Sequence, residues 1–152
     1  MKQFLSLLAL FIITLSIYGQ TNNPNYDSIL AIKLGADDYG MKKYVFVMLK
    51  SGTNESTDAV LKDSCFRGHT VNINRLVEED KLIVAGPMLK NDNSLRGIFI
   101  LNAATIEDAK VMLEPDLALK AKLLAADYYI WYGSAALPEY LEASDKIWKI
   151  NP

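Results

Sequence analysis

The sequence predicts a single α+β domain whose strands and helices follow the order β-α-β-β-α-β. Two observations predict this order. Four short runs of β-branched and aromatic residues are bounded by turn-forming residues, and apolar residues repeat at helical spacing after the first and the third run. The length of 152 residues is enough for one such domain and leaves little room for a second.

The four predicted strands are apolar segments, each too short to form a helix of its own. Turn-forming residues follow three of them: Ser51-Gly52, Gly86-Pro87 and Gly133. The polar segment 90–94 (KNDNS) predicts the turn between the second and third strands. The predicted strands are 44–49 (YVFVML), 81–85 (KLIVA), 95–101 (LRGIFIL) and 124–131 (LAADYYIW).

Two main helices are predicted between these strands. In the first, the segment 57–62 is followed by apolar positions at helical spacing down to Glu79, namely Phe66, His69, Ile73, Leu76 and Val77. The second begins after Thr105, a favourable capping residue with Asp108 three positions later. Pro115-Asp116 then predicts a further helical turn that ends near Lys122.

This order is the ferredoxin-like plan, an antiparallel four-stranded sheet with two helices on one face. Both alternating sets of side chains in 44–49 are apolar, and 98–101 shows the same pattern, so both faces of the sheet require cover. Because two helices cover only one face, we expect a homodimer through the sheet faces, a dimeric α+β barrel. The alternative is that the C-terminal segment with Trp148 folds over the open face.

The first residues predict export. Lys2, the apolar segment 4–18 and the small Gly19 predict a secretory signal peptide over 1–19. A membrane anchor is the alternative, but the apolar run is shorter than the ~20 residues that span a bilayer. We therefore expect a periplasmic or extracellular protein with no stable membrane insertion after cleavage.

Two extensions flank the expected core. The N-terminal one, over 20–40, contains a short helical pattern at 27–34 with Gly35 where a helix would end. The C-terminal one, over 134–152, is expected to be helical between Pro138 and Trp148.

The composition excludes several classes of protein and site. A net charge of -2 and the lack of long Lys/Arg runs argue against nucleic-acid binding. One histidine and one cysteine cannot form a closed zinc site, and no phosphate-binding loop or metalloprotease motif is present. We therefore expect no cofactor and no metal.

His69 is the first candidate for acid–base chemistry, because it lies on the apolar side of the predicted helix. The alternative is a core histidine whose ring nitrogens bind backbone carbonyls. A carboxylate could orient the ring, and Asp92 in the turn after Gly86-Pro87 is one option. Asp127 is another, whereas Asp116 is more simply an acid that favours a helix N-terminus.

Three further residues are candidates with ordinary alternatives. Cys65 precedes His69 by four positions, so a continuous helix would place both on one face, where a Cys–His pair could act as a nucleophile. The simpler interpretation is a small buried residue. Arg96 could bind a substrate carboxylate, or it could pair with Glu78 or Glu79. Trp131 could line a pocket, or it could pack in the core or a dimer interface.

Several pieces of sequence coincide with one known family. The chain from about 41 to 133 resembles the YciI-like (YCII-related domain) family. The resemblance rests on the combination of His69, Ala85-Gly86-Pro87, Arg96-Gly97 and Trp131-Tyr132-Gly133. The segments that carry it are MKKYVFVML, GHTVNINRLVEEDKLIVAGPM, DNSLRGIFIL, TIEDAKVMLEPDLALKAKL and DYYIWYG.

The resemblance implies a sheet-mediated dimer of ferredoxin-like subunits and a histidine–aspartate pair in a cleft. The histidine matches His69, and Asp92 is the aspartate that best matches the partner. A relative acts in dehydrochlorination of an aromatic compound, which implies proton abstraction without a cofactor. The chain departs from the family where an Asp-Pro would stand, because it has Asp116-Leu117 with Pro115 ahead, and it has Lys122 in place of a glycine.

These features predict a cofactor-independent enzyme of lyase or hydrolase type acting on a small aromatic or carbonyl substrate. His69 and Asp92 would be catalytic, with Gly86, Pro87, Arg96 and Trp131 around the substrate. The alternatives are a non-catalytic module of the cell envelope that binds a small ligand, and a structural dimer in which His69 is only packed.

Overall fold

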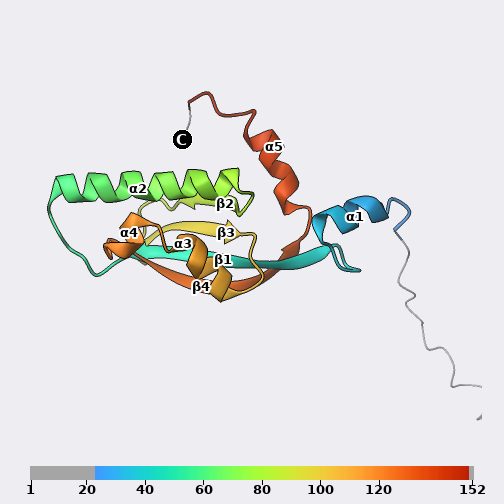
Figure 1. Ribbon diagram of the computed structural model, residues 1–152, viewed down its shortest axis with the longest axis horizontal. Helices are drawn as coiled ribbons and strands as arrows, with labels where there is room; N and C mark the ends of the chain where they lie inside the picture. The colour runs from blue at the N-terminus through green and yellow to red at the C-terminus, as the bar shows by residue number, and fades with distance from the viewer. Residues whose placement is uncertain (1–22, 151–152) are drawn as a thin grey trace, which may run out of the picture.

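The computed structural model describes residues 23–150, so the predicted signal peptide lies outside the described residues. The expected strands and main helices are all present (Figure 1). In chain order the elements are α1 (Ser28–Leu34), β1 (Met41–Ser51), α2 (Ala59–Glu78), β2 (Leu82–Pro87), β3 (Leu95–Leu101), α3 (Ile106–Leu113), α4 (Leu117–Lys120), β4 (Leu124–Ser134), η1 (Leu137–Glu139) and α5 (Tyr140–Ser144).

The four strands form one antiparallel sheet in the order β2-β3-β1-β4. β1 is central, and its Phe46 lies opposite Ile100 on one side and Tyr129 on the other. Two parallel strands, β1 and β2, therefore enclose β3, which is the split β-α-β arrangement. This confirms the predicted α+β, ferredoxin-like fold.

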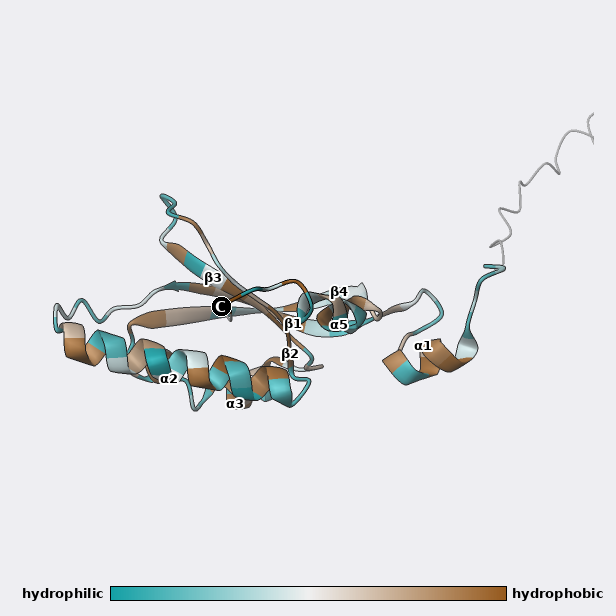
Figure 2. Ribbon diagram, turned by 90° about the horizontal axis from the view of Figure 1, so that it is seen from above, coloured by the Kyte–Doolittle hydropathy of each residue, from teal (hydrophilic) through white to brown (hydrophobic). Residues whose placement is uncertain are grey.

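The helices α2 and α3 lie on one face of the sheet (Figure 2). Alternation along β1 turns Val45, Val47 and Leu49 to this face, and all three are buried. The single core lies between this face and the helices. It also contains Leu76, Leu82, Phe99, Leu101, Ala103, Ala109, Leu113, Ala118 and Leu124. The predicted helical segments 57–62 and 66–79 join into the one continuous helix α2, whose first turn is capped by Asp58.

The opposite face of the sheet is also apolar, as the strand pattern predicts. Tyr44 packs against Trp131 with ring centres 5.6 Å apart, and Phe46 packs against Tyr129 at 6.4 Å. Tyr129 is 50% exposed and Trp131 38% exposed, so the described chain leaves part of this face open. The second copy predicted to cover it remains a prediction.

The C-terminal extension occupies only one end of this face. Tyr44 is fully buried there, and its hydroxyl donates to the carbonyl of Ser134. Beyond Ser134, the hydroxyl of Tyr140 in α5 donates to the carbonyl of Ile83 on the edge strand β2. The predicted tail helix is shorter than expected, and Trp148 is 48% exposed, so this residue does not cover the face.

The N-terminal extension is tied to the edge strand β4. The carboxylate of Asp37 accepts hydrogen bonds from the backbone N–H groups of Tyr39 and Met41 and from the hydroxyl of Tyr132. The hydrogen bond to Asp37 raises the pKa of Tyr132 to about 12, and the same contact lowers the pKa of Asp37.

Within 23–150, no helix is long and apolar enough to cross a bilayer.

Leu76 tests the position of the core, because it is fully buried where α2 packs on the sheet. Leu76→Ala should lower the free energy of unfolding by about 2–5 kcal/mol, through lost burial and a residual cavity. Val71→Ala is the matched control on the same helix, since Val71 is 67% exposed, and it should change stability by less than about 0.5 kcal/mol. Urea titration of both variants measures the difference, and equal losses would contradict this packing.

Candidate active site

His69 and Asp116 form a close pair between α2 and the start of α4. His69 Nδ1 lies 2.6 Å from Asp116 Oδ2. The His69 side chain is 14% exposed, whereas that of Asp116 is fully buried. The pair therefore lies at the boundary between the core and solvent, with the carboxylate on the inner side.

Asp116 is held by α4 as well as by His69. It is the N-cap residue of that helix, and its Oδ1 accepts hydrogen bonds from the N–H groups of Ala118 at 2.9 Å and Leu119 at 3.2 Å. A buried carboxylate needs such donors to replace the water that it has lost. One oxygen thus caps the helix while the other is directed at the imidazole. The Asp116 side chain is thus held in place by the backbone of α4, and it holds the imidazole in turn.

The imidazole is also held by two aromatic rings. It stacks on Phe99 of β3, with ring centres 5.8 Å apart and planes at 24°. The ring of Phe66, three positions earlier on α2, meets it edge-on at 6.3 Å. These contacts restrict the rotation of the ring about its own side-chain bonds.

The second ring nitrogen, Nε2, remains available. None of the described residues hydrogen-bonds to it, and the described part of the chain contains no buried side-chain nitrogen or oxygen atom without a partner. Nε2 therefore reaches solvent. A carboxylate at Nδ1 favours the tautomer with the proton on that nitrogen, which leaves a lone pair on Nε2.

Gly68 allows α4 to approach α2 at this point. A methyl group at position 68 would lie 2.4 Å from Leu117 Cδ1 and 2.9 Å from Leu117 Cβ, well inside van der Waals contact. Leu117 directly follows Asp116, so the missing side chain at Gly68 also determines how closely the carboxylate approaches His69. The pattern of residues around Gly68 gives no signal of this role.

Asp92 was the expected partner of His69, but within this chain the carboxylate that contacts His69 is that of Asp116. Asp92 lies exposed in the turn between β2 and β3. Asn91 organises this turn by itself, since its side chain bonds the backbone of Leu89, Asn93 and Leu95. The turn therefore folds on itself, and the buried carboxylate beside His69 is Asp116.

The four residues expected around a substrate are not gathered at His69 within this chain. Gly86 and Pro87 end the edge strand β2. Arg96 points to the opposite face of β3 from Phe99, whose ring stacks on His69. The Nε of Arg96 donates to Ser51 Oγ at 2.7 Å, and Arg96 does not pair with Glu78 or Glu79. Trp131 also faces the open side, where its ring lies over Gly133. Their predicted substrate roles stay untested.

Other candidates have ordinary surroundings. Cys65 is buried on α2, and Asp127 pairs with Lys50 on the open face. Among residues 23–150, no group of three or more His, Cys, Asp and Glu side chains could hold a metal ion. Two surface hollows, one between α3, α4 and β4 and one on α2, do not include His69 in their linings.

The comparisons with known proteins add a distant likeness. No protein-family model matches the chain, and no curated protein matches its sequence. Among solved structures, it is similar to 5-chloro-2-hydroxyhydroquinone dehydrochlorinase from Burkholderia phenoliruptrix AC1100 in complex with 2,5-dihydroxybenzoquinone. The identity is 19%, over 57% of this chain and 92% of that one, with a TM-score of 0.42. A likeness at this level assigns no activity and no site to this chain.

Asp116→Asn tests whether the carboxylate sets the state of the imidazole. The amide oxygen can still cap α4, but its NH₂ group would then face His69 Nδ1, which favours the tautomer protonated on Nε2. We expect this switch in the ¹⁵N spectrum of the neutral imidazole, whose assignment is unambiguous because the chain has one histidine. Asp63→Asn, an exposed change on α2, should leave the spectrum unaltered. An unchanged tautomer in Asp116→Asn would contradict the proposed orientation.

Gly68→Ala tests the close approach of the two helices. The added methyl group should displace Leu117 and Asp116 and remove the Nδ1–H signal of His69, although alanine itself favours a helix by about 1 kcal/mol. The double variant Gly68→Ala/Leu117→Ala removes the clash and should restore the signal. Ser64→Ala, at an exposed position of α2, is the control. If Gly68→Ala retained the signal, the steric argument would be wrong.

Proposed function

We propose that this chain is a cofactor-independent acid–base enzyme in which His69 transfers a proton through Nε2 and Asp116 orients the ring. The observation that supports it is the His69–Asp116 pair itself, with Nδ1 engaged at 2.6 Å and Nε2 open to solvent. Because Nε2 is exposed to solvent, a bound substrate could reach it while Asp116 holds the other side of the ring.

The chemistry follows from the two ends of the ring. In the neutral form Nδ1–H donates to Asp116, and the lone pair on Nε2 accepts a proton from a C–H, an O–H or a water molecule. The imidazolium that forms is stabilised by the adjacent carboxylate, which already lies at hydrogen-bonding distance. The same Nε2–H can then return the proton to a leaving group or to a carbanion. This is a cycle of lyase or hydrolase type.

A small aromatic or carbonyl substrate suits the surroundings of the ring. Phe66 and Phe99 both contact the imidazole, and Phe66 is 44% exposed, so an aromatic surface lies next to the open nitrogen. Flat apolar molecules pack favourably on such rings. The proposal therefore favours a ring or an enolisable carbonyl over a charged, strongly hydrated substrate.

We also propose that a second copy covers the open face of the sheet in an exported homodimer. The exposed aromatic rings of Tyr129 and Trp131 on that face support it, together with the half-buried side chains of Phe46, Met48 and Ile100. Export rests on the leader pattern of residues 1–19. Sedimentation of the purified protein tests the dimer, and a monomer at micromolar concentration would contradict it.

The alternative is a non-catalytic module that binds a small ligand. One observation favours it: His69 is absent from the linings of both hollows described above. A ligand that stabilised the protein against heat without being converted would support this function.

His69→Gln tests the proposal with the least disturbance, since the glutamine NH₂ can still donate to Asp116. The measurement is deuterium uptake from D₂O into enolisable ketones and chloride release from a chlorinated hydroquinone. Where the wild type is active, His69→Gln should lose activity by about 100-fold or more, with a nearly unchanged melting temperature. Thr70→Ala, an exposed change at the next position, should keep full activity. Full activity in His69→Gln, or a large loss of stability with no change in any reaction or ligand, would contradict the proposal.

A further inference from the structure

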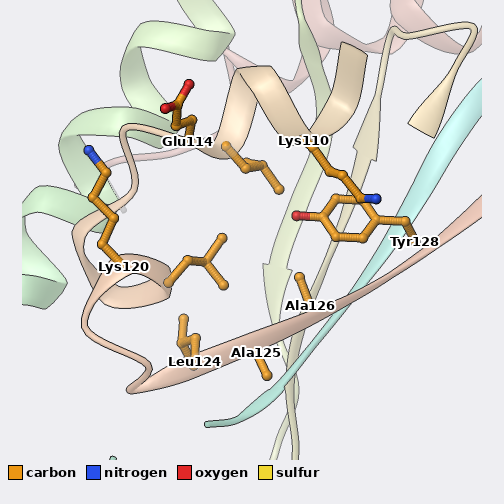
Figure 3. A pocket seen from close by; sticks show the side chains of 9 residues that line it. Lys110, Glu114, Lys120, Leu124, Ala125, Ala126 and Tyr128 are labelled. Atoms are coloured by element: carbon orange, nitrogen blue, oxygen red, sulfur yellow. The ribbon is translucent and has the colours of Figure 1, made fainter. Parts of the chain in front are cut away.

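We propose that the hollow between α3, α4 and β4 is a second binding site, which takes a small carboxylic acid with an apolar ring. Figure 3 shows the hollow from close by, with side chains from all three elements around it. Its volume is about 380 Å³, within the range of small-molecule sites and ample for a single ring. It opens on the helix side of the sheet, so a dimer through the other face would leave it free.

The floor of the hollow is apolar. Leu113 comes from α3, Leu119 from α4, and Leu124 and Ala126 from β4. Leu113 and Leu124 are almost fully buried and also belong to the core, so this floor is held in place by the fold. A rigid apolar floor favours a flat or cyclic hydrocarbon group over a hydrated one.

Tyr128 supplies a hydrogen-bond donor inside the hollow. Its hydroxyl points toward the space between the helices and the strand (Figure 3). No group among residues 23–150 accepts or donates a hydrogen bond at this hydroxyl, although the side chain is half-buried. A phenol is protonated at neutral pH, and burial together with the charge of Asp116 raises the pKa of Tyr128 further. A carboxylate oxygen is the acceptor that such a donor binds most strongly.

The charges at the rim also favour an anion. The lining includes Lys110 and Lys120 against one acidic residue, Glu114, and none of the three takes part in a salt bridge within the described residues. Lys110 Nζ lies 5.9 Å from the ring centre of Tyr128, and in Figure 3 it lies near the end of the ring opposite the hydroxyl. In Figure 3 the Glu114 carboxylate points away from the Tyr128 hydroxyl. The Lys120 ammonium also points away from this hydroxyl in Figure 3, so the two lysines contribute a positive potential at the rim, not a direct contact at the hydroxyl.

The lining of this hollow does not include His69 or Asp116, although the charge of Asp116 acts on Tyr128. The short helix α4 separates the hollow from the His69–Asp116 pair: its Leu117 packs against Gly68 on the α2 side, whereas its Leu119 lines the hollow. Binding in the hollow therefore needs no proton transfer by His69. A binding measurement therefore tests this site, and its result does not depend on whether His69 is catalytic.

Benzoate is the probe, with benzamide as the uncharged probe of the same shape. In a titration followed by backbone amide NMR, benzoate should cause saturable shifts confined to residues around 110–128, and benzamide should bind at least about tenfold more weakly. Tyr128→Phe, which keeps the ring and removes the donor, should weaken benzoate binding about tenfold. The double variant Lys110→Gln/Lys120→Gln should weaken it about threefold or more.

Lys62→Gln is the matched charge control, because Lys62 is exposed on α2 away from the hollow and should leave binding unchanged. A folded Tyr128→Phe variant that binds benzoate like the wild type would overturn the proposal. So would the absence of saturable shifts at millimolar benzoate, equal binding of benzamide, or shifts that cluster elsewhere on the molecule.

Discussion

The buried carboxylate of Asp116 is the interaction on which the candidate site depends. One of its oxygens accepts hydrogen bonds from two backbone N–H groups of α4, and the other lies at hydrogen-bonding distance from the imidazole of His69. A four-residue helix such as α4 is too short to be stable by itself, so its cap and its packing decide whether it forms. The carboxylate that caps α4 therefore also orients the histidine. A change at Asp116 would affect both the folding of α4 and the position of the His69 ring.

The sheet and α2 complete this arrangement. Phe99 of the buried strand β3 lies under the imidazole, while Gly68 lets Leu117 pack directly on α2. Leu113 belongs to the core, and Ala118 behind Asp116 is fully buried, so movement of α4 would disturb the main hydrophobic contacts. The pair is thus held by the interior of the molecule, although one nitrogen of the ring reaches solvent. Rigid support of this kind is what proton transfer by a side chain requires.

The fold could be predicted from sequence because its signals are local. The four strands are dense apolar runs bounded by turn residues, and the order of elements then leaves one common topology, which the register confirms. The pairing of His69 could not be predicted in the same way. Asp116 was identified as a helix N-terminal acid, which is correct, but its second oxygen and its burial depend on the close packing at Gly68. Asp92 follows the Ala85-Gly86-Pro87 element in sequence, yet Asn91 closes its turn away from α2. A proline next to an aspartate amid leucines was the one available signal of a buried cap.

The separation of the pair along the chain affects the order of folding. His69 and Asp116 are 47 residues apart, and β2, β3 and α3 all lie between them. Closing so long a loop costs chain entropy that early local contacts do not repay. We therefore expect the contact to form late in folding, with or after the pairing of β2 and β3 with β1 and the docking of α3. On that order the imidazole rotates freely until the native packing is complete, and a fixed tautomer would mark the native state.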